Sequence, residues 1–258
     1  MRLSQFGLGV MIAATLFYSQ PGHTEEAIDW NGFYSGLTAG AAVGTAKMSF
    51  SPSGLFNGPL AADIADGNYW RGQRDLDATG FTGGVYGGYQ QTYGNFLFGI
   101  EADIGYLGLN ESSSTTATVP ASGNTYRLDQ EISTDFFASL RPRVGYFPDA
   151  LAGKLLVFAT GGPTLTRADV TQTFTQLNNA YWSQGLSESK LLPGWAIGGG
   201  MEYALTKQWS LKAEYLYADL GSIENNNASG NTGFAAYSTD NKMDLTSHIF
   251  RLGATFHY

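Results

Sequence analysis

The sequence alternates apolar and polar side chains over segments of about a dozen residues. In the last segment, SHIFRLGATFHY (residues 247–258), Phe250, Leu252 and Phe256 share one parity. Arg251 lies on the other parity. Apolar residues at every second position are typical of a β-strand with one apolar face. This segment alone fits both a soluble sheet, whose apolar face meets a core, and a membrane barrel, whose apolar face meets lipid.

Segments of this kind recur along the whole chain. They cover approximately residues 30–44, 79–91, 96–109, 132–147, 155–168, 192–205, 209–220 and 247–258. Long polar connections follow the first, third, fifth and seventh segments, whereas the other connections are short. Short turns at one rim and long loops at the other are the plan of an up-and-down outer-membrane barrel. The pattern therefore predicts an all-β fold, an eight-stranded antiparallel up-and-down transmembrane β-barrel with both termini on the periplasmic side.

Assigning alternate positions to two faces gathers the charged residues of the segments on one face. These residues are Glu101, Asp103, Glu202 and Glu214 among the acids, and Arg141, Arg143, Lys212 and Arg251 among the bases. The balance of acids and bases favours a narrow barrel interior, where an unpaired buried charge costs several kcal/mol. We predict that these residues form an interior charge network. Arg251 is expected to meet Glu214, Glu202 or Glu101 in it.

The same rule assigns faces elsewhere. In the fourth segment it places Ile132 and Thr134 toward lipid, and Ser133 and Asp135 toward the interior. The fifth segment, residues 155–168, is apolar on both parities, so its faces stay unassigned.

Composition favours the membrane barrel over a soluble sandwich. Charged residues make up 14% of the chain, against roughly 25% in soluble domains. The 34 glycines and 14% aromatic residues suit a sheet in which small residues lie beside rings. The absence of cysteine excludes disulfides and thiolate metal sites, and a net charge of −8 argues against a nucleic-acid partner.

The N-terminus has the layout of a secretory signal. Arg2 precedes an apolar run over residues 6–17, which is too short to span a membrane as a helix. We predict a signal peptide over residues 1–24, with cleavage between 20 and 27, and a barrel domain over residues 25–258. A buried N-terminal helix is the alternative.

The histidines do not form a catalytic pattern. His23 lies in or next to the signal, His248 falls on the lipid-facing parity, and His257 falls inside. Ser247 and His248 are adjacent on a strand and point to opposite faces, so they form no dyad by themselves. We expect no catalytic site and no enzyme activity.

Metal and cofactor sites are not expected either. The acidic pairs Asp63 with Asp66 and Asp75 with Asp77 lack the rest of a calcium-binding loop. An eight-stranded interior is barely wide enough for the side chains that fill it, so little channel activity is expected.

Three stretches resemble a known family. They are DWNGFYSGLTAG (residues 29–40), GWAIGGGMEYALTKQWSLKAEYLYADLG (residues 194–221) and HIFRLGATFHY (residues 248–258). They resemble the small outer-membrane surface-antigen barrels of alphaproteobacteria, the RopB-like or porin-family barrels. The resemblance implies an abundant eight-stranded barrel exposed to the host or environment. It also implies that the terminal strand carries the assembly signal, in Phe250, Leu252, Phe256 and Tyr258.

These observations lead to one functional hypothesis with two alternatives. We expect a structural, surface-exposed outer-membrane protein in contact with outer-membrane lipid, lipopolysaccharide and the barrel-assembly machinery. Four outer loops would meet a host or small-molecule ligand. The alternatives are a loop-mediated receptor, since relatives are described as haemin-binding or as adhesins, and a lipid-modifying enzyme.

Overall fold

The computed structural model describes residues 29–54, 72–118, 123, 125–151, 153–178, 183–228 and 237–258. The β-strand segments are β1 (Gly32–Gly54), β2 (Gly72–Tyr93), β3 (Phe96–Leu107), β4 (Asn110–Thr118), β5 (Thr125–Tyr146), β6 (Leu155–Gln176), β7 (Ser183–Ala204), β8 (Trp209–Ala228) and β9 (Tyr237–His257). A short 3-10 helix, η2 (Asp149–Leu151), joins β5 to β6. Across these ranges no helix has both the length and the apolar character to cross a membrane. The expected signal, residues 1–24, and the pair Asp63 and Asp66 lie outside the described residues.

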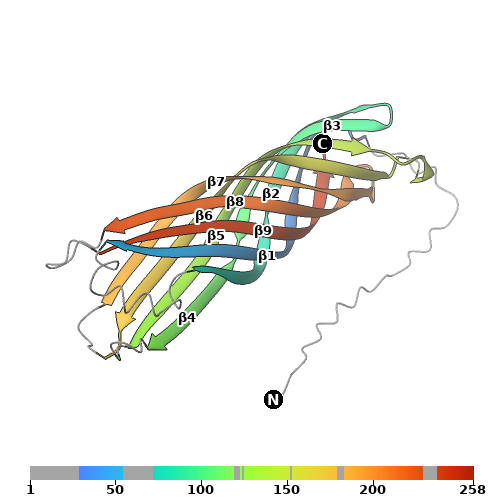
Figure 1. Cartoon of the computed structure of the whole chain (residues 1–258). Helices are drawn as coiled ribbons and strands as arrows, with labels where there is room; N and C mark the ends of the chain where they lie inside the picture. The colour runs from blue at the N-terminus through green and yellow to red at the C-terminus, as the bar shows by residue number, and fades with distance from the viewer. Residues whose placement is uncertain are drawn as a thin grey trace, which may run out of the picture.

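The strands close into a ring (Figure 1). Chain neighbours pair antiparallel in order, and β9 returns to pair with β1 from Tyr34↔His257 to Gly54↔Tyr237. β3 and β4 fill one place in the ring, between β2 and β5. Counted in this way, the described residues form eight antiparallel strands, which confirms the predicted fold class.

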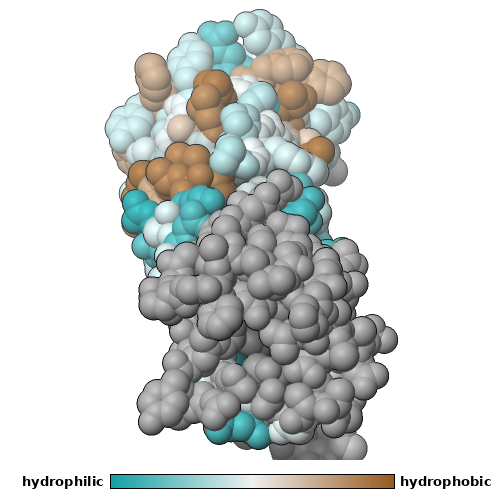
Figure 2. Space-filling view, turned by 60° about the vertical axis from the view of Figure 1, so that its left-hand side comes forward, coloured by the Kyte–Doolittle hydropathy of each residue, from teal (hydrophilic) through white to brown (hydrophobic). Residues whose placement is uncertain are grey.

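The wall of the barrel is apolar on its outer face. On β1, Phe33 and Leu37 are exposed while Tyr34 is buried, and the other strands alternate in the same way. Figure 2 shows patches of apolar side chains on the wall, with hydrophilic side chains beside them. An apolar band around a closed barrel is the surface that a hydrocarbon layer requires.

The strands are longer than the sequence predicted. Residues 110–118 were expected in a loop but form β4, and β6 and β8 continue to Gln176 and Ala228. These extensions are rich in serine, threonine and asparagine and lack an apolar outer face, so hydrophobic periodicity did not reveal them. Once a ladder is established, threonine continues it readily because its branched side chain suits a strand.

A β-bulge in β5 corrects one face assignment. The register with β6 shifts just after Thr134, so every residue before the shift changes sides. Ile132 and Thr134, expected to face lipid, are each 2% exposed and lie inside. Ser133 and Asp135, expected inside, lie on the outer face, where Asp135 is 3.6 Å from Arg167.

The structure assigns the two faces of β6, which the sequence left unassigned. Leu156 and Phe158 are buried inside, while Val157 and Leu165 are exposed on the outer face. Both sets are apolar because the interior here is itself partly apolar, and this explains why the pattern gave no assignment.

The barrel divides at the end with the long connections. β7 and β8 pair only up to Trp195↔Asp219, and β2 meets β4 only at Thr79↔Asn110. Beyond these pairs, the described residues form two four-stranded sheets, β8–β9–β1–β2 and β4–β5–β6–β7. Figure 1 shows the ends of β1, β8 and β9 diverging from those of β4 to β7. We call this region the fork.

Candidate functional site

The barrel interior brings together all the charged residues that the alternation gathered on one face. They come from β3, β5, β7, β8 and β9, and each is buried. We call this set the charge layer: Glu101, Asp103, Arg141, Arg143, Glu202, Lys212, Glu214 and Arg251. It holds four acids and four bases, so its formal charge is zero when all are ionised.

Arg141 is the centre of the charge layer. One of its terminal nitrogens, Nη2, lies 3.0 Å from Glu101 Oε1 and 2.9 Å from Asp103 Oδ2. The other, Nη1, lies 3.2 Å from Glu214 Oε1. Lys212 Nζ adds a bond of 2.7 Å to Glu101. Arg141 therefore links carboxylates from two sides of the barrel, β3 and β8.

Arg143 and Arg251 extend the charge layer in opposite directions. Arg143 forms an ion pair with Glu202 and lies 3.5 Å from Glu101 Oε2. Arg251 stands opposite Glu214 in the β8–β9 register, yet its Nη1 lies 3.2 Å from Asp103 Oδ2 across the barrel. The contact with Asp103 differs from the three glutamates expected for Arg251, because the arginine side chain is long enough to cross the narrow interior.

Neutral side chains complete the layer, and the sequence reasoning missed them. Tyr34 donates to Glu101 Oε2 at 3.1 Å, and Ser210 donates to Glu202 Oε1 at 2.5 Å. The ammonium of Lys212 lies 4.3 Å from the centre of the Tyr86 ring, a cation–π distance. Strand parity would have found all three, since each lies on the inward parity of its strand.

Apolar residues close the interior on the short-turn side of the charge layer. Trp30 precedes β1 and packs against Phe147 with ring centres 5.5 Å apart. Its indole nitrogen donates to the Gly153 carbonyl at 3.0 Å. With Leu97, Leu156 and Ala204, these rings form the end cluster. His257 lies between the end cluster and the charge layer, 5.1 Å from the Trp30 ring and 3.3 Å from Glu202 Oε1.

The segment that carries Trp30 is fixed by its neighbours. Asn31 donates from its backbone and side-chain nitrogens to Asp29 Oδ1, at 3.0 and 2.8 Å. The bond from the backbone N–H, followed by that from the side chain, lowers the pKa of Asp29 below its ordinary value. Asn31 Oδ1 in turn accepts from the backbone N–H of Thr92 at 2.8 Å.

A second apolar cluster fills the interior on the other side of the charge layer. We call it the apolar core. Its larger members are Leu107, Leu109, Ile132, Phe137, Leu192, Leu216, Leu220, Ile223, Met243, Leu245 and Ile249. They come from both sheets of the fork and from the barrel below it. Polar interiors are usual in barrels of this class, so this apolar filling is a finding that the sequence reasoning did not anticipate.

The residues of the expected assembly signal lie on the outer face of β9. Phe250, Leu252 and Tyr258 are exposed, and Phe256 is partly exposed. The Tyr258 hydroxyl is 2.9 Å from Ser35 Oγ, and its backbone N–H donates to Phe33 O at 3.1 Å. The chain end is thus part of the seam that closes the barrel.

The remaining candidates are separate from the interior. His248 is exposed on the outer face of β9, as predicted, and its Nδ1 is 2.8 Å from the Tyr215 hydroxyl. Asp77 accepts from Thr45 at 2.9 Å on the same face of the wall. The side chain of Asp75 lies outside the described set. Where side chains are described, no group of three or more histidine, aspartate or glutamate residues could hold a metal ion.

Known proteins resemble this chain in sequence and in fold. Residues 10–257 match the family described as "Outer membrane protein beta-barrel domain". The 31 kDa outer-membrane immunogenic protein of Brucella melitensis is 33% identical over 215 residues, which cover 81% of each chain. The 22 kDa outer membrane protein of Rhizobium leguminosarum is 26% identical, over 65% of this chain and 66% of the relative. Among solved structures, OprG of Pseudomonas aeruginosa has a TM-score of 0.46 and 12% identity, over 88% of this chain and 97% of OprG.

Proposed function

This chain belongs to the family of outer-membrane β-barrel domains, among the small outer-membrane proteins of alphaproteobacteria, and on that premise we propose a structural and surface-display role. The protein would anchor in the outer membrane and present its fork and outer loops to the surroundings. One observation carries this proposal, namely that the interior is filled in three successive layers. These are the end cluster, the charge layer and the apolar core.

The filled interior argues against channel activity. Ions or polar solutes would have to displace two apolar clusters and a charge layer whose members pair with one another. Separating a buried charge of this layer from its partners costs several kcal/mol, because an unpaired charge is poorly tolerated in a dry interior. The same pairing argues against catalysis, since the buried carboxylates hold structural ion pairs.

The proposed orientation places the short turns and both termini in the periplasm and the fork outside. The chain contains no cysteine, so single cysteines give clean reporters of this orientation. Thr116→Cys on β4 tests the fork, and Gln208→Cys tests the turn between β7 and β8; both side chains are exposed. In intact cells, a membrane-impermeant maleimide is expected to label only the Thr116 variant. Labelling of only the Gln208 variant would overturn the proposed orientation.

We propose that the C-terminal strand also serves assembly. Deleting Tyr258 removes an exposed aromatic ring and two hydrogen bonds, to Ser35 and Phe33, at the end of the seam between β9 and β1. The expected result is a severalfold lower amount of folded barrel in the outer membrane, measured by the gel mobility shift on boiling. Tyr258→Phe keeps the ring and is expected to assemble normally. Equal assembly of the deletion and the wild type would contradict this role.

We propose two classes of partner outside the barrel. The apolar wall would contact outer-membrane lipid, including lipopolysaccharide. The fork would contact a host or environmental macromolecule, because β4 beyond Asn110 pairs with β5 alone among the described strands. An edge of this kind is open to pairing with another chain. Haemin binding stays an alternative for the outer loops. A saturable haemin titration that is lost when the loops are trimmed would favour it.

A further inference from the structure

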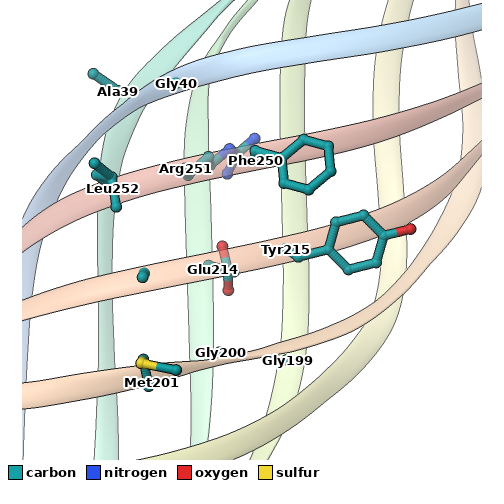
Figure 3. A pocket seen from close by; sticks show the side chains of 11 residues that line it. Ala39, Gly40, Gly199, Gly200, Met201, Glu214, Tyr215, Phe250, Arg251 and Leu252 are labelled. Atoms are coloured by element: carbon teal, nitrogen blue, oxygen red, sulfur yellow. The ribbon is translucent and has the colours of Figure 1, made fainter. Parts of the chain in front are cut away.

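A hollow lies in the outer face of the wall, over β1, β7, β8 and β9 (Figure 3). Its volume is about 470 Å³. The outward side chains at its floor are small: Ala39 on β1, Ala213 on β8 and Gly199, which has none, on β7. The register places the lining residues in two rows across the strands. One row is Ala39, Leu252, Ala213 and Met201, and the next row toward the fork is Phe250, Tyr215 and Gly199. The hollow therefore crosses four neighbouring strands.

Larger apolar side chains wall the hollow at both ends. Phe250 and Tyr215 stand at the end toward the fork, and Leu252 and Met201 stand at the other end (Figure 3). Arg251 also borders it, but its guanidinium belongs to the buried charge layer. The surface offered to a ligand is thus almost entirely apolar, and it suits a hydrocarbon chain.

A polar pair stands above the hollow, toward the fork. The Tyr215 hydroxyl is 2.8 Å from His248 Nδ1, and the two rings stack with centres 6.1 Å apart. The ring of Tyr217, which lies opposite His248 in the β8–β9 register, packs edge-on against His248 at 5.4 Å. A polar group facing hydrocarbon is costly unless it is hydrogen-bonded. With Nδ1 engaged by Tyr215, the exposed His248 ring can offer Nε2 to a hydrogen-bonding group of a lipid.

The spacing of these features falls within one leaflet of a membrane. His248 and Leu252 are four residues apart on β9, which is about 13 Å along a strand and about 10 Å of depth for a strand tilted by about 40°. Half of a hydrocarbon core is about 15 Å thick. A lipid whose polar linkage group lies at His248 would therefore bring the end of its attached acyl chain to the hollow. Ala41, which lies opposite Phe250, leaves space for that chain to descend along β1.

We propose that the hollow and His248 form a site for one acyl chain of a lipopolysaccharide molecule, which rests on the orientation given under the proposed function. In that orientation His248 lies in the outer leaflet. The acyl chains of lipopolysaccharide are attached through amide and ester groups and carry hydroxyls, which are suitable partners for a histidine nitrogen. A phospholipid of the inner leaflet would approach the hollow from its other end, where Leu252 and Met201 offer apolar atoms.

The test is retention of lipid by the protein extracted from outer membranes in mild detergent, read by native mass spectrometry. The wild-type barrel is expected to keep one lipopolysaccharide molecule. Ala213→Phe fills the hollow, and Ala39→Leu fills it from a different strand; each is expected to lower the retained fraction severalfold. His248→Phe keeps a ring but removes the polar contact, and a similar loss is expected. The matched control is Ala138→Phe, a partly exposed position on the outer face of β5, away from the hollow.

Three results would overturn the proposal: equal retention in Ala213→Phe and Ala138→Phe, retention of phospholipid in place of lipopolysaccharide, or a lipid-free dimer that Ala213→Phe dissociates. The gel mobility shift on boiling verifies that each variant is folded. An error in the proposed orientation would be detected separately, by the labelling of Thr116→Cys and Gln208→Cys. If only the Thr116 variant is labelled, but lipid retention is the same in all variants, the orientation holds and only the proposed lipid site is wrong.

Discussion

Replacing Arg141 by methionine is expected to lower the free energy of unfolding by about 3–5 kcal/mol. Arg141 is fully buried and forms ion pairs with Glu101, Asp103 and Glu214. Methionine fills a similar space but leaves three buried carboxylates short of one positive charge. The measurement is urea-induced unfolding in lipid vesicles, followed by tryptophan fluorescence.

Two further variants sharpen this prediction. Arg167→Met removes an arginine of the outer face whose side chain is 47% exposed and whose partner is Asp135. Its expected cost is about 0–1 kcal/mol, because solvated ion pairs contribute little. Adding Glu214→Gln to Arg141→Met restores the charge balance, and part of the lost stability is expected to return. Equal effects of Arg141→Met and Arg167→Met would contradict a paired, dry charge layer.

Replacing Phe137 by alanine is expected to cost about 3–5 kcal/mol, whereas replacing Phe136 is expected to cost less. The two residues are adjacent on β5, but Phe137 is buried in the apolar core and Phe136 lies on the outer face. Alanine at Phe137 leaves a cavity that the barrel cannot close. Alanine at Phe136 leaves a gap that lipid can fill. The loss is therefore limited to the free energy of transferring the ring from water to an apolar environment, without the cost of a cavity.

The same unfolding measurement compares the two phenylalanine variants. A larger loss for Phe136→Ala than for Phe137→Ala would contradict the facing of this strand. It would also contradict an apolar core that begins at Phe137.

The sequence was sufficient to predict the barrel and the members of its charge layer, because both depend on strict alternation. Residues such as Glu101 and Lys212 lie on the inward parity of uninterrupted strand segments. The partner of Arg251 could not be predicted, since it depends on how far a long side chain reaches across the barrel to Asp103. Ile132 was misassigned because a single bulged residue reverses parity, and bulges have no fixed sequence signature.

The fork and the apolar core could not be predicted from the sequence, for a different reason. Hydrophobic alternation identifies strands that face lipid, but the extensions beyond the membrane carry serine and threonine on their outer face. Their inward residues, such as Ile223 and Met243, come from different strands and meet the rest of the apolar core only when the barrel closes. Trp30 begins the first predicted segment, but its insertion against Phe147 depends on the folded turn after β5 and could not be predicted.

The central claim is that this barrel fills its own interior and conducts no ions, and planar-bilayer recording tests it most directly. Refolded protein, verified by its gel mobility shift on boiling, is inserted into bilayers and recorded in concentrated salt. The filled interior predicts a baseline without stable unitary steps, because the end cluster and the apolar core both block the path. Stable steps of porin size that grow with salt concentration would contradict it.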